Sequence, residues 1–150
     1  MSDNIYHAIV EQRRNDEFRN KYEPKTNTFE QTEYKSLFYE RKFDGIYGWL
    51  DGYGNPPNRH LDVIVITNNE YELGDKIEIK IIGVFLRNDK DNKLIGIEQT
   101  RNENEIEELP ISELSMIKRI YPRIKEKEGW FGKEIAMRVI NEYINNENYC

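Results

Sequence analysis

Cysteine is nearly absent from this sequence, and long apolar runs are missing altogether. The 150-residue chain holds one cysteine, Cys150, so no disulfide can form within it. A chain without disulfides suits a reducing compartment, and we expect a cytoplasmic protein. No stretch approaches the roughly 18 apolar residues needed to span a bilayer, and we recognise no hydrophobic signal segment. These absences argue against a helical membrane protein or a disulfide-stabilised secreted one.

Positive charge is also in short supply. The chain has 22 Lys and Arg against 28 Asp and Glu, a formal net charge of −6 and a pI near 5.1. A general nucleic-acid binder needs a basic face to neutralise phosphates, so that class is disfavoured. An acidic metal site, a basic protein partner or simple solubility all remain compatible with this charge. The composition, 37% hydrophobic and 33% charged, is that of an ordinary globular protein of one domain.

Several common catalytic signatures are missing as well. There is no Gly-x-Ser-x-Gly motif, no cysteine with a partner base and no zinc-ligand spacing. The glycine-rich loop at 52–55 precedes no helix, so it is not a phosphate cradle. We interpret His60 as a solvent-facing loop residue, and His7 carries no functional argument.

The first 43 residues predict a helix and then a strand. Apolar residues in 1–25 recur at partly helical spacing, and Ser2, Asp3 or Asn4 can cap a short amphipathic helix. A loop follows near Pro24 to Thr28. The aromatic-rich run 37–43 resembles a strand closed by the turn signal Asp44-Gly45.

The middle of the chain predicts strands, and the last third predicts helices. Residues 61–67 form an apolar β-branched run, 76–81 alternate strictly, and a polar turn at 88–92 leads to a returning strand at 93–98. From Ser112 the apolar spacing becomes helical, through Ile124, although Pro122 must shorten that helix. A last helix carries an apolar stripe from Ile135 to Ile144. Strands followed by helices indicate an α+β fold.

Six short sequence motifs, in this order, resemble motifs of the soluble magnesium-dependent (family I) inorganic pyrophosphatases over roughly residues 37–144. They are Tyr47-Gly48-Trp49, Leu61-Asp62-Val63-Ile64-Val65, Ile82-Gly83-Val84-Phe85, Asn88-Asp89-Lys90-Asp91-Asn92-Lys93-Leu94, Glu108-Leu109-Pro110 and Glu128-Gly129-Trp130. The resemblance implies a small OB-like five-stranded β-barrel with two C-terminal helices. We expect one domain: an N-terminal helix and loop in 1–30, the barrel in 37–100 and the helices in 112–146.

The same resemblance implies a set of site residues. Hydrolysis in that family depends on divalent cations, which take oxygen ligands and neutralise the phosphates. Asp62, Asp89 and Asp91 match family aspartates that bind metal. A second set matches residues that contact phosphate: Arg41, Tyr47, Lys93 and Lys125.

The chain departs from the family at its metal-binding motif, Asp-x-Asp-Pro-x-Asp. In ungapped register the first two aspartates become Pro57 and Arg59, and the proline becomes His60. We expect Arg59 to place a cation where magnesium ions sit in the family. The family tyrosine before Lys125 is replaced by Ile124. These changes predict that hydrolysis has been lost and that no cofactor is bound.

Three functions therefore compete. In the first, a pyrophosphatase-fold pseudoenzyme acts by protein binding, for example as an immunity protein that neutralises a basic toxin or nuclease; its acidic segment 103–108 motivates this hypothesis. The alternative is a divergent magnesium- or manganese-dependent hydrolase of a phosphoanhydride, acting through the three aspartates. A third hypothesis keeps binding of phosphate or pyrophosphate without turnover. If the three aspartates converge, hydrolysis is favoured. If an Arg59 salt bridge fills the space between them, a site that has lost hydrolysis is favoured.

Overall fold

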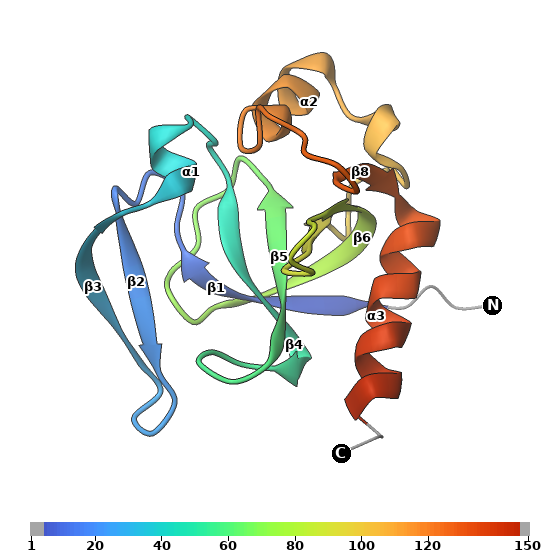
Figure 1. Cartoon of the computed structure of the whole chain (residues 1–150). Helices are drawn as coiled ribbons and strands as arrows, with labels where there is room; N and C mark the ends of the chain where they lie inside the picture. The colour runs from blue at the N-terminus through green and yellow to red at the C-terminus, as the bar shows by residue number, and fades with distance from the viewer. Residues whose placement is uncertain (1–4, 148–150) are drawn as a thin grey trace.

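A computed structural model describes residues 5–147 of the chain, and side chains through residue 145 (Figure 1). The predicted capping residues Ser2, Asp3 and Asn4, and Cys150, lie outside the described residues. No helix in the described range is long and apolar enough to cross a membrane.

Five strands close into a barrel. The sheet order is β1-β4-β5-β7-β6-β8, and β1 also pairs with β6, so the first five strands form a ring that β8 extends. All of these pairings are antiparallel except β5 with β7. The bounds are β1 Tyr6–Gln12, β4 Ile46–Gly54, β5 His60–Ile66, β6 Lys76–Leu86, β7 Lys93–Glu98 and β8 Gly129–Gly132. The predicted α+β class and OB-like five-stranded barrel are confirmed.

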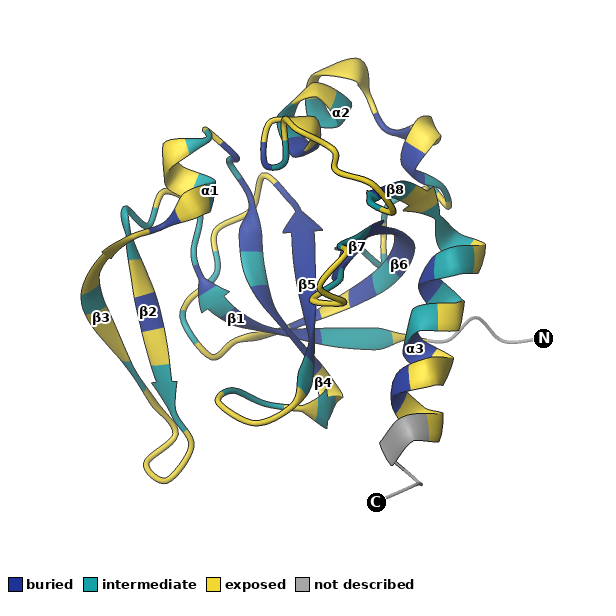
Figure 2. Cartoon of the chain, in the orientation of Figure 1, coloured by how far each residue is buried: buried dark blue, intermediate teal, exposed yellow. Residues whose placement is uncertain are grey.

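The apolar run of β5 is continuous because both of its faces are buried (Figure 2). Val63 and Val65 face the barrel interior, which α3 also covers, while Ile64 and Ile66 face a second core under α2. A strand buried on both sides has no need of polar alternation. Only glycine fits in the Tyr-Gly-Trp motif, because a Cβ on Gly48 would lie 1.8 Å from the carbonyl oxygen of Ile9.

The predicted N-terminal helix is wrong, because this segment is β1 followed by a hairpin. Ala8, Ile9 and Val10 are consecutive and all buried, since β1 pairs with β4 on one edge and β6 on the other. A helix would bury only every third or fourth residue. The hairpin of β2 (Phe18–Glu23) and β3 (Thr28–Lys35) then projects from the barrel (Figure 1).

The predicted strand at 37–43 is also wrong. It is a single helical turn, α1 (Leu37–Glu40), which begins where the Ser36 hydroxyl accepts a hydrogen bond from the backbone N–H of Tyr39. Lys42, at φ 59°, turns the chain toward β4. The local cap therefore outweighs the strand propensity of the aromatic residues.

The helices of the last third are shorter than their apolar pattern. The acidic segment 103–108 contains η1 (Ile106–Glu108), whose Ile106 is buried. α2 (Ile111–Lys118) begins one residue before Ser112 and ends ahead of Pro122, so Ile124 lies outside it and is 55% exposed. α3 (Lys133–Glu147) packs on the barrel through Ala136, Ile140 and Tyr143.

Candidate functional site

Asp62 is the centre of a buried polar cluster at the start of β5. The parallel pairing of β5 with β7 sets Asp62 opposite Lys93, and both residues are 6% exposed. One carboxylate oxygen of Asp62 lies 2.8 Å from His60 Nε2, and the other lies 2.8 Å from Lys93 Nζ. Burial raises the pKa of Asp62, but the His60 hydrogen bond and the Lys93 charge outweigh it and lower that pKa to about 2. Asp62 is therefore ionised at any physiological pH.

Lys93 connects this aspartate to two further groups. Its ammonium lies 3.2 Å from an Asp91 carboxylate oxygen and donates to the Tyr47 hydroxyl at 3.1 Å. Although burial lowers the pKa of Lys93, its carboxylate partners raise it above the ordinary value. Burial and the Asp62 charge raise the pKa of Tyr47 far above its ordinary value, so Tyr47 remains a neutral hydroxyl. The cluster presents a fixed cation and a neutral donor side by side.

The cluster opens into a pocket of about 500 Å³, which we call the phosphate pocket. Four cationic side chains line it together with Tyr121 and three carboxylates: Arg19, Lys35, Arg87 and Lys93, with Glu11, Asp62 and Asp91. Arg and Lys at such a concave site are suited to phosphate oxygens.

Glu11 of β1 carries the most displaced carboxyl pKa in this pocket. Burial and the negative charge of Asp62 raise it from 4.5 to about 7. A carboxyl that titrates near neutral pH can accept or give a proton under working conditions. The Asp62 carboxylate, which titrates near 2, is a poor acceptor by comparison.

The predicted site residues fall into three groups. Asp62, Asp91, Tyr47 and Lys93 line the phosphate pocket together. Arg41 and Lys125 line a neighbouring pocket of about 510 Å³, and Arg87 and Tyr121 line both pockets. Asp89 lines neither; it is half-exposed at the β6–β7 turn, 3.4 Å from Arg87, and accepts the backbone N–H of Asp91. The three aspartates do not converge.

The expectation for Arg59 is wrong. Its guanidinium lies 3.8 Å from the centroid of the Tyr143 ring and donates to the Tyr143 carbonyl at 3.1 Å, so it packs against α3. Arg59 is not among the residues that line the phosphate pocket with Asp62. His60, interpreted as a loop residue facing solvent, is instead the partner of Asp62. Tyr121 rather than position 124 supplies a tyrosine to the pocket, stacked 4.3 Å from Phe85.

Sequence reasoning missed Glu11, Arg19, Lys35, Arg87 and Tyr121. Glu11 and Arg19 come from β1 and β2, a region predicted to be helix and loop, and Lys35 ends β3, between that region and the predicted strand at 37–43. The β-prone residues Thr28, Phe29, Thr32 and Tyr34 were the available signal of a strand in this segment.

The described residues do not fit a resident cluster of several metal ions. Residues 5–147 contain no group of three or more His, Cys, Asp or Glu side chains placed to hold a metal. Both oxygens of Asp62 are held by His60 and Lys93, and Asp91 shares the same ammonium. Magnesium needs several free oxygen ligands, and here cationic side chains take their place.

Comparison with known proteins identifies the family of this chain. The family description "Inorganic pyrophosphatase" matches residues 8–148. The inorganic pyrophosphatase of Nanoarchaeum equitans (strain Kin4-M) is 30% identical over 162 residues, which cover 95% of this chain and 96% of that protein.

Solved structures share the fold. An inorganic pyrophosphatase from Neisseria gonorrhoeae superposes with a TM-score of 0.74 at 21% identity, over 96% of this chain and 91% of that one. A truncated Trypanosoma cruzi vacuolar soluble pyrophosphatase in complex with PPi gives 0.65 at 18%, over 99% and 72%. On the match across nearly its whole length, this chain belongs to the inorganic pyrophosphatase family.

Proposed function

We propose that this protein binds a phosphoanhydride of the pyrophosphate class and hydrolyses it in the phosphate pocket. The observation that carries the proposal is the buried Asp62–Lys93 pair, with its Tyr47 donor, at the floor of a pocket ringed by cations. Family membership supports it, as does the Trypanosoma cruzi relative, a protein of the same fold described in complex with PPi.

The chemistry asked of these residues is positioning and charge neutralisation. Arg19, Lys35 and Arg87 can bind the phosphoryl oxygens while the Lys93 ammonium and Tyr47 hydroxyl donate from the floor. A water oxygen bonds to one phosphorus, the bridging P–O bond breaks, and two phosphates form. Glu11, with a pKa of about 7, is the carboxylate suited to take the water proton.

The divalent cation, in this proposal, arrives with the substrate. Because the carboxylates are already paired with His60 and Lys93, we assign no resident metal. The substrate is then a magnesium or manganese complex of the phosphoanhydride, and the metal lowers the negative charge that the pocket must bind.

Phosphate release from magnesium pyrophosphate tests this function. We expect turnover by the wild type, a loss of at least about 100-fold in Asp62→Asn and at least about tenfold in Glu11→Gln. Arg138→Gln, an exposed arginine on α3 paired with Glu134, is the matched control and should keep full activity. Equal activity in wild type and Asp62→Asn would remove the site from the reaction.

Binding without turnover is a second candidate. It is favoured by the pairing of Asp62 with Lys93. Among the described residues, the pocket then has cationic side chains that can bind an anion but no free group of carboxylates that can bind a metal. Pyrophosphate would then raise the melting temperature, with or without magnesium, while no phosphate is released. Release of phosphate would exclude this candidate.

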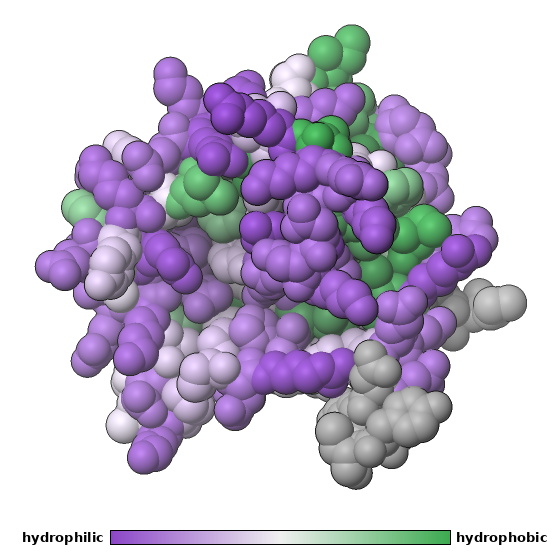
Figure 3. All heavy atoms as spheres, in the orientation of Figure 1, coloured by the Kyte–Doolittle hydropathy of each residue, from purple (hydrophilic) through white to green (hydrophobic). Residues whose placement is uncertain are grey.

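Action on a basic protein partner, as an immunity protein, remains a prediction. In the acidic segment that motivated it, Glu103 pairs with Arg101, Glu105 accepts the Lys133 N–H and Glu108 accepts the Asn104 N–H. On the face shown in Figure 3, hydrophilic side chains predominate and hydrophobic ones show in separate groups. A cationic protein that binds at physiological salt and is released by charge reversal at the exposed Glu107 would support the prediction; binding unchanged by that substitution would oppose it. We propose the cytoplasm as the location, because a chain with a single cysteine forms no internal disulfide and suits a reducing compartment.

A further inference from the structure

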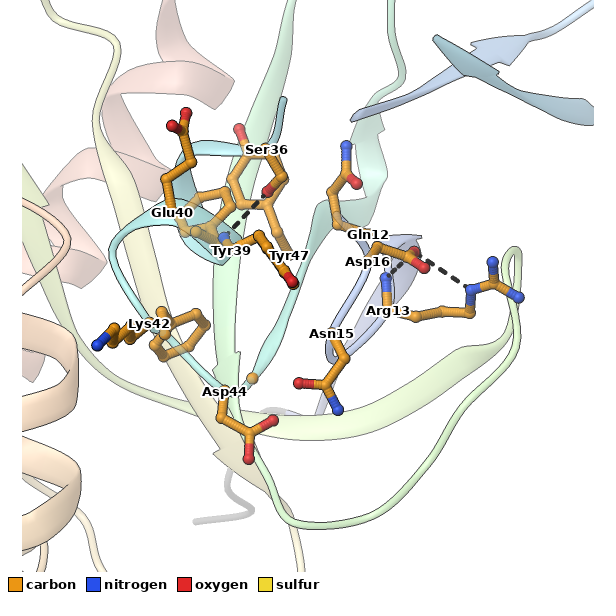
Figure 4. Close-up of a pocket in the computed structure, with 13 residues that line it drawn as sticks. Gln12, Arg13, Asn15, Asp16, Ser36, Tyr39, Glu40, Lys42, Asp44 and Tyr47 are labelled. Atoms are coloured by element: carbon orange, nitrogen blue, oxygen red, sulfur yellow. Dashed lines mark hydrogen bonds and ion pairs between the residues drawn. The ribbon is translucent and has the colours of Figure 1, made fainter. Parts of the chain in front are cut away.

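A second cavity, of about 480 Å³, shares part of its lining with the phosphate pocket. Figure 4 shows the residues that line this second cavity. We call it the side cavity. Gln12, Ser36, Phe38 and Tyr47 line both spaces, so the two are neighbours that meet at these four side chains. A ligand longer than pyrophosphate can occupy the two together. The volume of the side cavity falls in the range of roughly 300–1,000 Å³ that is usual for sites of small organic ligands.

The two spaces differ in charge. Cations outnumber carboxylates in the phosphate pocket, by four to three. The side cavity is lined by three carboxylates, Asp16, Glu40 and Asp44, and by Arg13 and Lys42; Asp16 is paired with Arg13, and Asp44 is paired with Arg14. The buried ammonium of Lys93 therefore favours phosphates in the phosphate pocket, and the side cavity, whose cations Arg13 and Lys42 are not buried, suits a group without charge.

Aromatic rings and one amide give the side cavity a specific chemistry. Phe38 lies 4.6 Å from the Tyr47 ring, and Tyr39 at the cavity wall is 44% exposed and available for stacking. Asn15 and Asp44 point toward one another across the cavity (Figure 4). Within residues 5–147 the Asn15 carboxamide has no hydrogen-bond partner, whereas Asp44 is held by Arg14.

An exposed ring to stack on and an amide without a partner in the described range, both in one cavity, are groups that proteins use for heterocyclic bases. We propose that the protein's substrate class is the nucleoside 5′-diphosphates, with the phosphates on Lys93 and the nucleoside in the side cavity. This inference rests on the proposed function and specifies its substrate. A water oxygen bonds to the terminal phosphorus, the bridging P–O bond breaks, inorganic phosphate forms, and nucleoside monophosphate leaves with the electron pair while Glu11 takes the water proton.

Three probes separate the nucleoside from the phosphates: ADP, methyl diphosphate and pyrophosphate, each with magnesium. Calorimetric titration gives Kd, and phosphate release gives kcat/KM. We expect ADP to bind about tenfold or more tightly than methyl diphosphate, because only ADP fills the side cavity.

Two substitutions test the contacts. Tyr39→Ala should raise the Kd for ADP about tenfold by removing the stacking surface. Asn15→Gly should raise it about threefold to tenfold, because it removes the amide while glycine readily keeps the backbone at φ 67°. Asn27→Gly is the matched control: Asn27 also has positive φ, at 53°, and lies in the β2–β3 turn away from both cavities. The constants for pyrophosphate should change less than twofold in all three variants.

The outcomes are distinguishable. Selective loss of ADP binding in Tyr39→Ala and Asn15→Gly, but not in Asn27→Gly, supports the inference. Turnover of pyrophosphate with no preference for ADP over methyl diphosphate overturns the inference and leaves the proposed function standing. No binding or turnover of any of the three probes overturns both.

Discussion

Two parts of this molecule use the same side-chain chemistry with different consequences. At the start of β5, Asp62 and Lys93 form an ion pair whose side chains are 8% and 7% exposed. At the β6–β7 turn, Asp89 and Arg87 form one whose side chains are 53% and 31% exposed. The first pair perturbs the pKa of its neighbours and forms part of the phosphate pocket. In the second pair Arg87 reaches that pocket, but Asp89 is a surface charge in solvent. Burial, rather than residue type, separates the functional aspartate from the incidental one.

The largest expected effect comes from breaking the buried pair. Lys93→Met leaves Asp62 and Asp91 without their ammonium, and we expect a loss of about 3–5 kcal/mol in the free energy of unfolding, measured by urea denaturation at pH 7. Pyrophosphate binding should also disappear. Lys93→Arg, which keeps the charge, is the control; a loss below about 1 kcal/mol in Lys93→Met would show that the pair is not buried in solution.

A gain of stability is expected at Glu11. Its pKa is about 7 when folded and 4.5 ordinarily, so between these values the folded protein binds the proton that the unfolded chain has released. Stability from this group is therefore present at pH 4.5 and lost as pH rises through 7. Glu11→Gln should be more stable than wild type by about 1–3 kcal/mol at pH 8 and equal to it near pH 4.5. Denaturation at both pH values measures this, and a difference independent of pH would contradict it.

A smaller effect is expected at His60. Burial opposes its protonation, but the Asp62 hydrogen bond outweighs burial and raises the pKa of His60 above 6.5. This stabilisation is fully present below pH 6.5 and is lost as pH rises through the folded pKa. Relative to His60→Gln, the wild type should gain about 1 kcal/mol of stability between pH 8 and pH 6. An identical pH dependence in both proteins would rule out the charged pair.

The exposed pair supplies the smallest effect. Asp89→Asn keeps the hydrogen bond to the Asp91 N–H but removes the charge next to Arg87. We expect less than about 0.5 kcal/mol in unfolding free energy and less than a twofold change in phosphate release. A loss of activity comparable to that of Asp62→Asn would place Asp89 in the site and refute the contrast between the two regions.

The strands of the barrel were predictable wherever the pattern was local. The β-branched run at 61–67 predicts a strand buried on both faces, and the alternation at 76–81 predicts a strand buried on one face. β5 and β6 lie at these positions. The N-terminal segment was not predictable, because its strand forms only through pairing with β4 and β6, tens of residues away. Its apolar residues only mimic helical spacing, because Ile9 and Val10 are adjacent buried residues of β1 and Phe18 begins a separate strand, β2.

The site was predictable only where strand register sets it. Asp62 and Lys93 meet because β5 and β7 are parallel and in register, and the family resemblance indicated both. The direction of Arg59 depends on Tyr143, 84 residues later, and no local pattern encodes that contact. Arg19 and Lys35 reach the pocket only because the hairpin folds beside it.

Phosphate release from magnesium pyrophosphate by purified wild type and Asp62→Asn, measured side by side at pH 8, tests the central claim most directly. We predict turnover in the wild type and a fall of at least about 100-fold in the variant, with the fold retained. Turnover that survives the substitution, or is absent from a folded wild type that nonetheless binds pyrophosphate, would contradict the claim that the Asp62–Lys93 pocket is an active site.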